Sequence, residues 1–169
     1  MTTPNSMDAR ILAAVSKEEI RDALFRYCRG LDRGDADLMR SAYHEDAVEH
    51  HGDFYDGPAR SYCDFVVEHL DTVSVARHEL TNVIIDLDGE TARSESYFLS
   101  IQRMEGREDD DFIMGRYLDR FAFRDGQWRI TERRVVFDWS IPVAPNGESP
   151  YAPSFPVGKR DRTDPLWQL

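Results

Sequence analysis

The chain has 169 residues, the size of a single domain. Hydrophobic residues make up 41% of it and aromatic residues 11%, enough for one core that encloses a pocket. The formal net charge of −11 opposes binding to phosphate backbones and to anionic lipid surfaces, so we expect neither nucleic acid nor a membrane as a partner. No segment has the pattern of a signal peptide or a membrane span, which makes a cytoplasmic location the expectation.

The first helix is predicted from a start signal, an apolar stripe and a stop signal. Residues 1–15 carry no clear cap and are expected to form a flexible arm. Ser16 is followed three residues later by Glu19, the spacing of a capping box. Apolar residues recur at helical spacing over residues 20–31, and Gly34 ends the pattern.

Two shorter helices are predicted next. Asp35 is placed to cap the second helix, whose buried side includes Tyr43. A strand-like segment at residues 47–51 separates it from a turn that ends in Pro58. Proline is favoured in the first turn of a helix, and residues 62–70 carry the apolar stripe of a third helix.

The second half of the chain has the pattern of an antiparallel meander. Its strand-like segments are residues 74–87, 90–103, 112–124 and 127–137. Asp-Gly pairs at 88–89 and 125–126 are signals for two-residue hairpin turns. Helices followed by a meander predict an α+β domain, a cone of a strongly curved, mainly antiparallel sheet packed on three N-terminal helices and enclosing a pocket. We expect this cone to cover residues 16–140.

The C-terminal segment, residues 141–169, is a proline-rich tail. It holds six of the eight prolines, together with Tyr151, Phe155 and Trp167. Proline lowers the entropy cost of ordering a segment, and aromatic side chains favour burial. The tail is therefore expected to pack on the cone or on a neighbouring subunit.

Three motifs carry a resemblance to a known family. They are Tyr-Cys-Arg-Gly-Leu-Asp at residues 27–32, His-Glu-Leu-Thr-Asn at 78–82, and Gly-Arg-Tyr at 115–117 followed by Arg-Asp-Gly-Gln-Trp-Arg-Ile at 124–130. With the order of the elements, these motifs make the chain similar, over about residues 14–140, to the SnoaL-like branch of the nuclear transport factor 2-like superfamily.

The resemblance implies an activity and a set of catalytic residues. Scytalone dehydratase, bile acid 7α-dehydratase and hexachlorocyclohexane dehydrochlorinase, all members of this branch, are lyases that use no cofactor. Their pattern implies that Asp32 is an orienting carboxylate, that His78 is a base, and that Tyr27 belongs to the same catalytic group. Other members are isomerases, cyclases, binding modules and small subunits of ring-hydroxylating dioxygenases.

The chemistry of the two motif residues agrees with that implication. A neutral imidazole is a good base near pH 7, and a carboxylate on its second nitrogen fixes the tautomer and stabilises the imidazolium. Proton abstraction followed by loss of a β-leaving group is an elimination, and the same pair could start a retro-aldol cleavage. Strand alternation puts Leu80, Asn82 and Ile84 on the same face as His78.

Further side chains are candidates for substrate binding in the pocket. The set is His51, Tyr43, Asn82, Phe98, Arg116, Tyr117 and Trp139. His50 and His51 are neighbours on a strand and must point to opposite faces, so only one of them, by our interpretation His51, can line the pocket. Arg116 either anchors a substrate carboxylate or forms an ion pair on the outer sheet, for example with Glu95.

The remaining reactive side chains receive structural interpretations. His44 and His69 are expected on solvated helix faces. Cys28 and Cys63 have no Cys-x-x-Cys spacing and are expected to be buried and free. No pair of histidines has the spacing of a metal-binding helix motif, so we expect no metal site and no cofactor.

These observations favour a cofactor-free lyase, that is a dehydratase, a dehydrohalogenase or an aldol-type enzyme, or a related isomerase, acting on a small hydrophobic molecule that contains a ring. The alternative is a non-catalytic dioxygenase subunit or a small-molecule-binding module. The strands carry apolar residues on both faces, as Ile84 and Ile85 illustrate, which predicts a homo-oligomer, either a trimer or a dimer.

Overall fold

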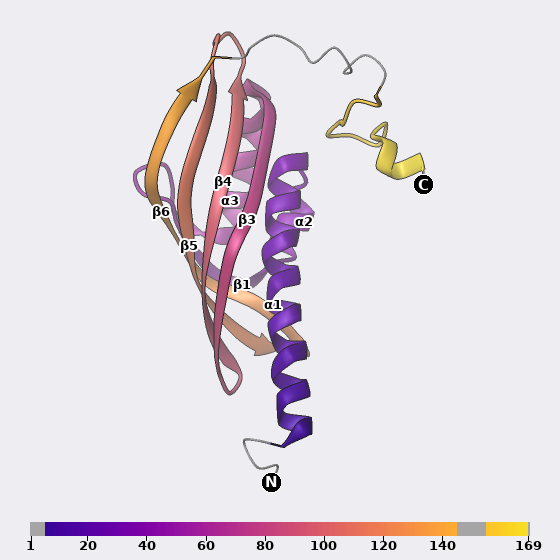
Figure 1. The fold of residues 1–169 in the computed structure, drawn as a ribbon, viewed down its shortest axis with the longest axis vertical. Coiled ribbons are helices and arrows are strands. Elements are labelled where there is room, and N and C mark those ends of the chain that lie inside the picture. The colour runs from indigo at the N-terminus through magenta and orange to yellow at the C-terminus, as the bar shows by residue number, and fades with distance from the viewer. Residues whose placement is uncertain (1–5, 145–154, 169) are drawn as a thin grey trace.

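The computed structural model describes residues 6–144 and 155–168. A curved sheet of six strands wraps around one long helix and two shorter ones (Figure 1). This arrangement confirms the predicted α+β cone. None of the helices in the described ranges is both long enough and apolar enough to cross a bilayer.

The first helix, α1, spans Met7–Arg33 and projects beyond the end of the sheet at its N-terminus (Figure 1). Its cap is Ser6, whose hydroxyl accepts a hydrogen bond from a backbone amide in the first turn. The predicted start at Ser16 is therefore wrong, and so is a flexible arm over the part of 1–15 that the structure describes, because Ser16 is buried inside the helix. Gly34 ends α1 in the left-handed conformation, as predicted.

The shorter helices begin where their caps predict. They are α2 (Ala36–Arg40), α3 (Ala59–His69) and the 3₁₀ turn η1 (Leu70–Thr72). The carboxylate of Asp35 accepts a hydrogen bond from the Leu38 amide at 2.9 Å, and Pro58 immediately precedes α3. Gly30 lets α2 approach α1 closely, because a Cβ at this position would lie 2.6 Å from the side chain of Met39.

The sheet contains the predicted meander and two further strands. The strands are β1 (Tyr43–His50), β2 (Asp56–Pro58), β3 (Val73–Asp88), β4 (Thr91–Met104), β5 (Asp110–Arg124) and β6 (Gln127–Val143). Their order is β2-β1-β6-β5-β4-β3, and every neighbouring pair is antiparallel except β1 and β6. Asp125 and Gly126 both have positive φ, as the predicted hairpin turn requires. The first hairpin turns one residue later than predicted, at Gly89 and Glu90.

A bulge in β3 changes which residues face the interior. His78 and Leu80 pair regularly with β4, but the register shifts just after Leu80. Beyond the shift, Ile85 is 3% exposed whereas Ile84 is 58% exposed. The predicted alternation is therefore wrong after Leu80, and Asn82 is an exposed residue at the bulge.

An ion pair lies inside the aromatic core. The guanidinium of Arg133 donates two hydrogen bonds to Asp119, at 2.7 and 2.8 Å, and both side chains are completely buried. The rings of Tyr27 and Tyr117 cover the guanidinium with centroids 4.1 and 4.2 Å from its carbon. This pair is therefore separated from solvent on every side.

The described part of the tail contacts the cone near the C-terminal end of α1. Asp164 is 3% exposed, forms an ion pair with Arg33, and accepts a hydrogen bond from the Lys159 amide at 2.7 Å. Arg160 donates to the carbonyl oxygen of Asp32 at 3.2 Å. The tail begins slightly later than predicted, since β6 extends to Val143, and Tyr151 lies outside the described residues.

Candidate active site

A cavity of about 450 Å³ lies between the helical layer and the concave face of the sheet. Its volume is in the range of small-molecule sites. Most of its wall is apolar, with Leu31, Val66, Phe98, Ile113, Val135 and Phe137 among its residues. The polar side chains on the wall are His51, His69, Thr72, His78, Ser100 and Gln102.

Asp32 and His78 are in direct contact, as predicted. Asp32 belongs to the last turn of α1 and His78 to β3, and Nδ1 of the histidine lies 2.7 Å from Oδ1 of the carboxylate. The second carboxylate oxygen accepts a hydrogen bond from the backbone amide of His78 at 3.2 Å. Only 7% of the His78 side chain and 16% of the Asp32 side chain are exposed. Two contacts therefore hold this carboxylate against the imidazole in a partly dry environment.

The second nitrogen of His78 faces a serine that the sequence analysis missed. Nε2 lies 3.1 Å from Oγ of Ser100, and the side-chain amide of Gln102 donates to the same hydroxyl at 3.2 Å. Because a carboxylate can only accept, the proton of neutral His78 is on Nδ1 and the lone pair is on Nε2. The alternation of Phe98, Ser100 and Gln102 on the inner face of β4 was the available signal for this polar group.

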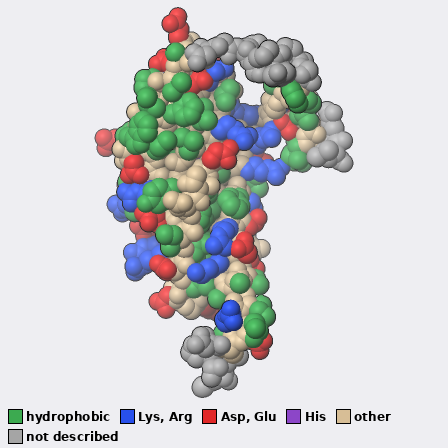
Figure 2. Space-filling model, viewed as in Figure 1, with side chains coloured by type: hydrophobic (Ala, Val, Ile, Leu, Met, Phe, Trp, Pro, Cys, Tyr) green, Lys and Arg blue, Asp and Glu red, His purple; other side chains and the backbone are tan. Residues whose placement is uncertain are grey.

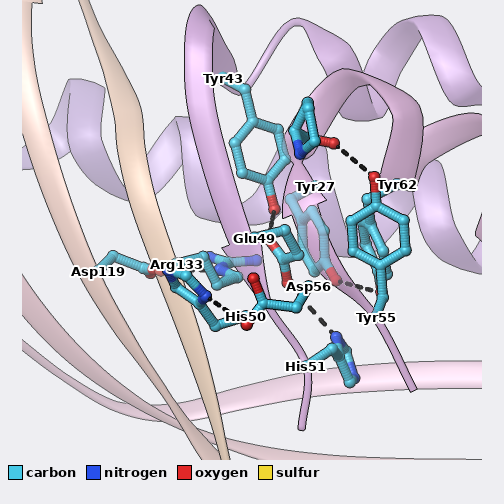
Figure 3. A network of polar contacts seen from close by, with 11 residues as sticks. Tyr27, Tyr43, Glu49, His50, His51, Tyr55, Asp56, Tyr62, Asp119 and Arg133 are labelled. Carbon is cyan, nitrogen blue, oxygen red and sulfur yellow. Dashed lines mark hydrogen bonds and ion pairs between the residues drawn. The ribbon is translucent and has the colours of Figure 1, made fainter. Parts of the chain in front are cut away.

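A second histidine, His51, lies on another wall of the cavity, and a buried carboxylate, Glu49, lies behind it in the polar network of Figure 3. Glu49 is completely buried on β1 and accepts a hydrogen bond from the Tyr43 hydroxyl at 2.8 Å. Nδ1 of His51 lies 3.4 Å from the other oxygen of Glu49. The His51 ring lines the cavity and stacks on Tyr62, with centroids 5.4 Å apart. His51 therefore occupies the wall where it was expected, with a carboxylate partner that was not expected.

Tyr27 does not reach the cavity. It is completely buried in the core, and its hydroxyl lies 3.3 Å from that of Tyr62, which does line the cavity. Burial raises the pKa of both phenols well above the usual value, so both stay protonated at neutral pH. The expectation that Tyr27 belongs to the same catalytic group as Asp32 and His78 is corrected by this placement.

Two aromatic residues of the predicted substrate-binding set line the cavity. Phe98 and Tyr117 stack with ring centroids 4.5 Å apart and an interplanar angle of 19°. Gly115 leaves room for Phe98, because a Cβ at this position would lie 2.6 Å from that ring. These two rings contribute aromatic surface to the cavity wall.

The other predicted contacts lie elsewhere. Tyr43 is buried against Glu49, Asn82 is exposed at the β3 bulge, and Trp139 is 47% exposed; none of the three lines the cavity. The expectations for Asn82 and Trp139 were wrong because the strand patterns did not reveal the register shifts that reset the inward face. Tyr43, expected on the second helix, instead begins β1 and lies in the core. Arg116 is also outside the cavity.

Arg116 instead forms an ion-pair cluster on the outer sheet. It lies 2.9 Å from Glu95 and 3.2 Å from Asp138, and these hydrogen bonds raise the pKa of the guanidinium further. The expected alternative, an ion pair with Glu95, is the correct one.

Two expectations for histidines also change. His44 is buried on β1 rather than solvated on a helix, and its Nε2 lies 2.9 Å from the carbonyl oxygen of Ala122. His69 is exposed on α3 as expected, yet its ring lines the cavity, and its Nδ1 lies 2.8 Å from the carbonyl oxygen of Phe65. Within the described ranges, no three His, Cys, Asp or Glu side chains form a group that could hold a metal ion.

The cysteines are buried and unpaired, as expected. Burial raises the pKa of each thiol to about 12. Neither Cys28 nor Cys63 is therefore a thiolate at neutral pH, and neither has the ionised form that a nucleophile needs.

Comparisons with known proteins agree with this architecture. Residues 13–134 match the family model of the SnoaL-like domain. No curated protein matches the sequence. Hexachlorocyclohexane dehydrochlorinase LinA-type3 from Novosphingobium barchaimii LL02 superimposes with a TM-score of 0.73 at 16% identity, over 86% of this chain and 99% of that one.

Two further structures, both from Novosphingobium aromaticivorans, have the same fold. A scytalone dehydratase-like protein gives a TM-score of 0.69 at 20% identity, over 85% of this chain and 99% of its own. An NTF2-like protein with a cystatin-like fold gives 0.68 at 18% identity, over 91% and 97%. At such identities these structures are evidence for the fold alone. Because the family model covers most of the chain, the protein belongs to the SnoaL-like domain family.

Proposed function

We propose that the protein is a cofactor-independent lyase that acts on a small, hydrophobic, ring-containing molecule. The reaction is an elimination, as in a dehydratase or dehydrohalogenase, or an aldol-type cleavage, and a related isomerisation needs the same first step. The observation that carries the proposal is His78, with Nδ1 bound by Asp32 at 2.7 Å and the ring on the wall of the cavity.

The first step is removal of a proton from carbon. Nε2 of His78 takes a proton next to an activating carbonyl group, and the carboxylate of Asp32 stabilises the imidazolium that forms. The electron pair left on carbon then forms a double bond as the β-leaving group departs. A base in this position contributes typically ~10²–10⁴-fold to the rate.

The cavity wall supports an apolar ring as the substrate. Phe98 and Tyr117 belong to the same cavity wall as the imidazole, and most other wall residues are apolar. The similarity in fold to proteins named as a dehydrochlorinase and as scytalone dehydratase-like supports a reaction of the lyase or isomerase type.

A nucleophilic serine is the alternative that the geometry raises. Asp32, His78 and Ser100 are joined in the same order as a serine-hydrolase triad. Ser100, however, is 1% exposed and lies within β4, where it pairs with β3 on one side and β5 on the other. Backbone amides engaged in a sheet are not available for an oxyanion, so the positions in β4 lack the donors that acyl transfer requires. An elimination needs no such donors.

The non-catalytic alternative predicts a different assembly. A dioxygenase subunit needs a large partner chain, whereas we propose a homo-oligomer, either a trimer or a dimer. Apolar side chains gather on the face of the molecule that Figure 2 shows. The exposed apolar residues of β4 and β6 include Tyr97, Trp139, Ile141 and Val143. Light scattering of the purified protein tests this proposal: a monomer mass at micromolar concentration contradicts it.

One aldol compound tests the proposed reaction. 4-Hydroxy-4-phenylbutan-2-one gives 4-phenylbut-3-en-2-one by loss of water, and benzaldehyde with acetone by retro-aldol cleavage. Chromatography of the products therefore separates the two routes. We expect the wild-type protein to accelerate one route and His78→Gln to remove the acceleration. His44→Gln is the comparison variant, because that histidine lies outside the cavity. Equal rates for wild type and His78→Gln contradict the proposed function.

A further inference from the structure

We propose that His51, held by the buried carboxylate of Glu49, is a second proton-transfer residue of this cavity and acts as the general acid for an oxygen leaving group. The substrate of the site would then carry a hydroxyl at the β position, and the reaction would be loss of water. This inference rests on the proposed function, because it supplies the second proton transfer of the same elimination.

Glu49 is the carboxylate that contacts His51 from inside the core. Its side chain is completely buried, and a buried carboxylate is costly unless it has hydrogen-bond donors or a positive partner. Two side chains contact it, the Tyr43 hydroxyl at 2.8 Å and Nδ1 of His51 at 3.4 Å (Figure 3). The tyrosine stays neutral, because burial raises the pKa of its phenol well above the usual value.

Arg133, the buried arginine that pairs with Glu49 in the register of β1 and β6, forms its hydrogen bonds with another carboxylate. Both hydrogen bonds of Arg133 go to Asp119, at 2.7 and 2.8 Å. The remaining terminal nitrogen, Nη1, is buried and has no hydrogen-bond partner in the described part of the chain. His51 is therefore the group in hydrogen-bond contact with Glu49 that can become positive, and a positive imidazole gives the buried carboxylate a charged partner in direct contact.

The ring of His51 is held so that its other nitrogen is available. Tyr62 stacks on one side with an interplanar angle of 23°, and Phe54 packs edge-on with centroids 5.6 Å apart. The side chain is 27% exposed and lines the cavity. With Nδ1 directed to Glu49, Nε2 is the nitrogen that a ligand can contact.

The two histidines approach the cavity from different walls. In the sheet, β1, which leads into His51, is separated from β3, which carries His78, by the three strands β6, β5 and β4. Each histidine has a carboxylate on Nδ1, and both rings belong to the wall of one cavity. One ligand between them can lose a proton to the first histidine and receive one from the second.

Water and halide differ in what they require of the second histidine. Hydroxide is a poor leaving group and needs a proton, whereas chloride leaves as a stable anion. In the proposed step, Nε2 of His78 takes the α proton and the C–H electron pair forms the double bond. The C–O bond breaks, and the oxygen keeps the electron pair of that C–O bond. It takes the proton from Nε2 of His51 and leaves as water. His78 ends protonated and His51 neutral, and exchange with solvent restores both.

The adjacent histidine provides a matched control. His50 is also 27% exposed and contacts a carboxylate, Asp56, at 3.0 Å, but its ring does not line the cavity. The experiment compares two probes with one carbon skeleton, 4-hydroxy-4-phenylbutan-2-one and 4-chloro-4-phenylbutan-2-one. The proteins are the full chain and its variants His51→Gln, Glu49→Gln, His50→Gln and His78→Gln.

We expect His51→Gln to lower the rate of water loss by ~10²–10⁴-fold and to leave the loss of chloride unchanged. Glu49→Gln should change the rates in the same direction, and His50→Gln should change neither. If His51→Gln slows both probes equally, or slows neither, the general acid is not His51. The assignment of His78 as the base is unaffected by either result. If His78→Gln slows neither probe, the proposed function itself fails.

A second measurement does not depend on turnover. Diethyl pyrocarbonate acylates unprotonated imidazole, and mass spectrometry of peptides resolves His50 from His51. We expect Glu49→Gln to accelerate acylation of His51 at neutral pH and to leave that of His50 unchanged. Equal acylation of His51 in the wild type and in Glu49→Gln overturns the inference. Circular dichroism identifies any loss of fold in Glu49→Gln, and the more exposed His51→Gln carries the kinetic test independently.

Discussion

The Arg133–Asp119 and Asp32–His78 pairs both lie inside this molecule, and they differ in what surrounds them. The Arg133–Asp119 pair has no exposed side-chain surface, and the rings of Tyr27 and Tyr117 pack against its guanidinium. The Asp32–His78 pair is 16% and 7% exposed, and its histidine lines a cavity of about 450 Å³. A ligand can therefore reach the second pair and not the first.

The comparison teaches that contact with a cavity, rather than charge pairing, distinguishes a candidate site from a structural pair. The closed pair contributes to the packing of the core, where removal of one partner leaves an uncompensated buried charge. In the open pair, Nε2 of His78 contacts the Ser100 hydroxyl and carries the lone pair that can accept a proton. Substitutions should therefore affect stability at one pair and turnover at the other.

The largest effect is expected on turnover at the open pair. Asp32→Asn should lower the rate of elimination by ~10²–10⁴-fold, because an amide can hold the imidazole in the wrong tautomer and cannot stabilise its positive form. The free energy of unfolding should change by only about 1 kcal/mol, the net value of one hydrogen bond. Parallel rate assays and urea titrations measure both, and a large loss of stability with unchanged turnover contradicts the comparison.

At the Arg133–Asp119 pair, a substitution is expected to lower stability rather than turnover. Asp119→Asn leaves Arg133 buried without its carboxylate and should lower the free energy of unfolding by about 3–5 kcal/mol. Asp46→Asn is the matched control, since its pair with Arg124 is exposed and should contribute at most about 1 kcal/mol. Urea denaturation followed by circular dichroism measures the difference. Equal stability of the two variants would show that the buried pair is not structural.

A smaller loss of turnover is expected from substitution of Ser100, which contacts His78 on the cavity wall. Ser100→Ala removes the hydroxyl that lies 3.1 Å from Nε2 of His78 and should lower turnover by about tenfold, the rate equivalent of one hydrogen bond. Complete loss of activity, as for an essential nucleophile, would instead favour the acyl-transfer alternative. The assay is the steady-state rate with the hydroxyketone probe.

The smallest effect concerns the tail, which contacts the backbone of Asp32 through Arg160. Hydrogen bonds from the Lys159 and Leu166 amides, and then from Arg33, lower the pKa of Asp164 to about 2. Because the folded pKa lies below the usual value of about 3.9, this contact stabilises the tail above about pH 4 and is lost as the pH falls through about 2. The amide resonance of Lys159 in NMR spectra should follow that titration.

A change of the Lys159 resonance centred near pH 4 would mean that Asp164 is not held by these contacts. We further propose that the tail supports the site, so that removal of residues 155–169 lowers turnover and leaves the cone folded. Full activity of the truncated protein contradicts this role.

The sequence predicted the elements and the Asp32–His78 pair because their signals are local. Asp35 and Pro58 mark helix starts, Asp125 and Gly126 mark a turn, and strand patterns mark the meander. The start of α1 was misplaced because both Ser6 and Ser16 have the chemistry of a cap, and only packing shows that Ser16 is internal.

The rest of the site depends on features that a single sequence does not display. The bulge after Leu80 reverses the inward face of β3, which moved Asn82 out of the predicted wall. The partner of His51 was missed because Glu49 is a charged residue on a strand and was not expected to be completely buried. Long-range packing, rather than local preference, determines both outcomes.

The central claim, that His78 removes a proton from carbon inside this cavity, can be tested without any leaving group. 4-Phenylbutan-2-one incubated in deuterium oxide exchanges its α protons when a base removes them, and NMR follows the loss of the proton signal. The account predicts that the wild-type protein accelerates this exchange and that His78→Gln does not. Equal acceleration by wild type and His78→Gln would contradict the claim that His78 is the base.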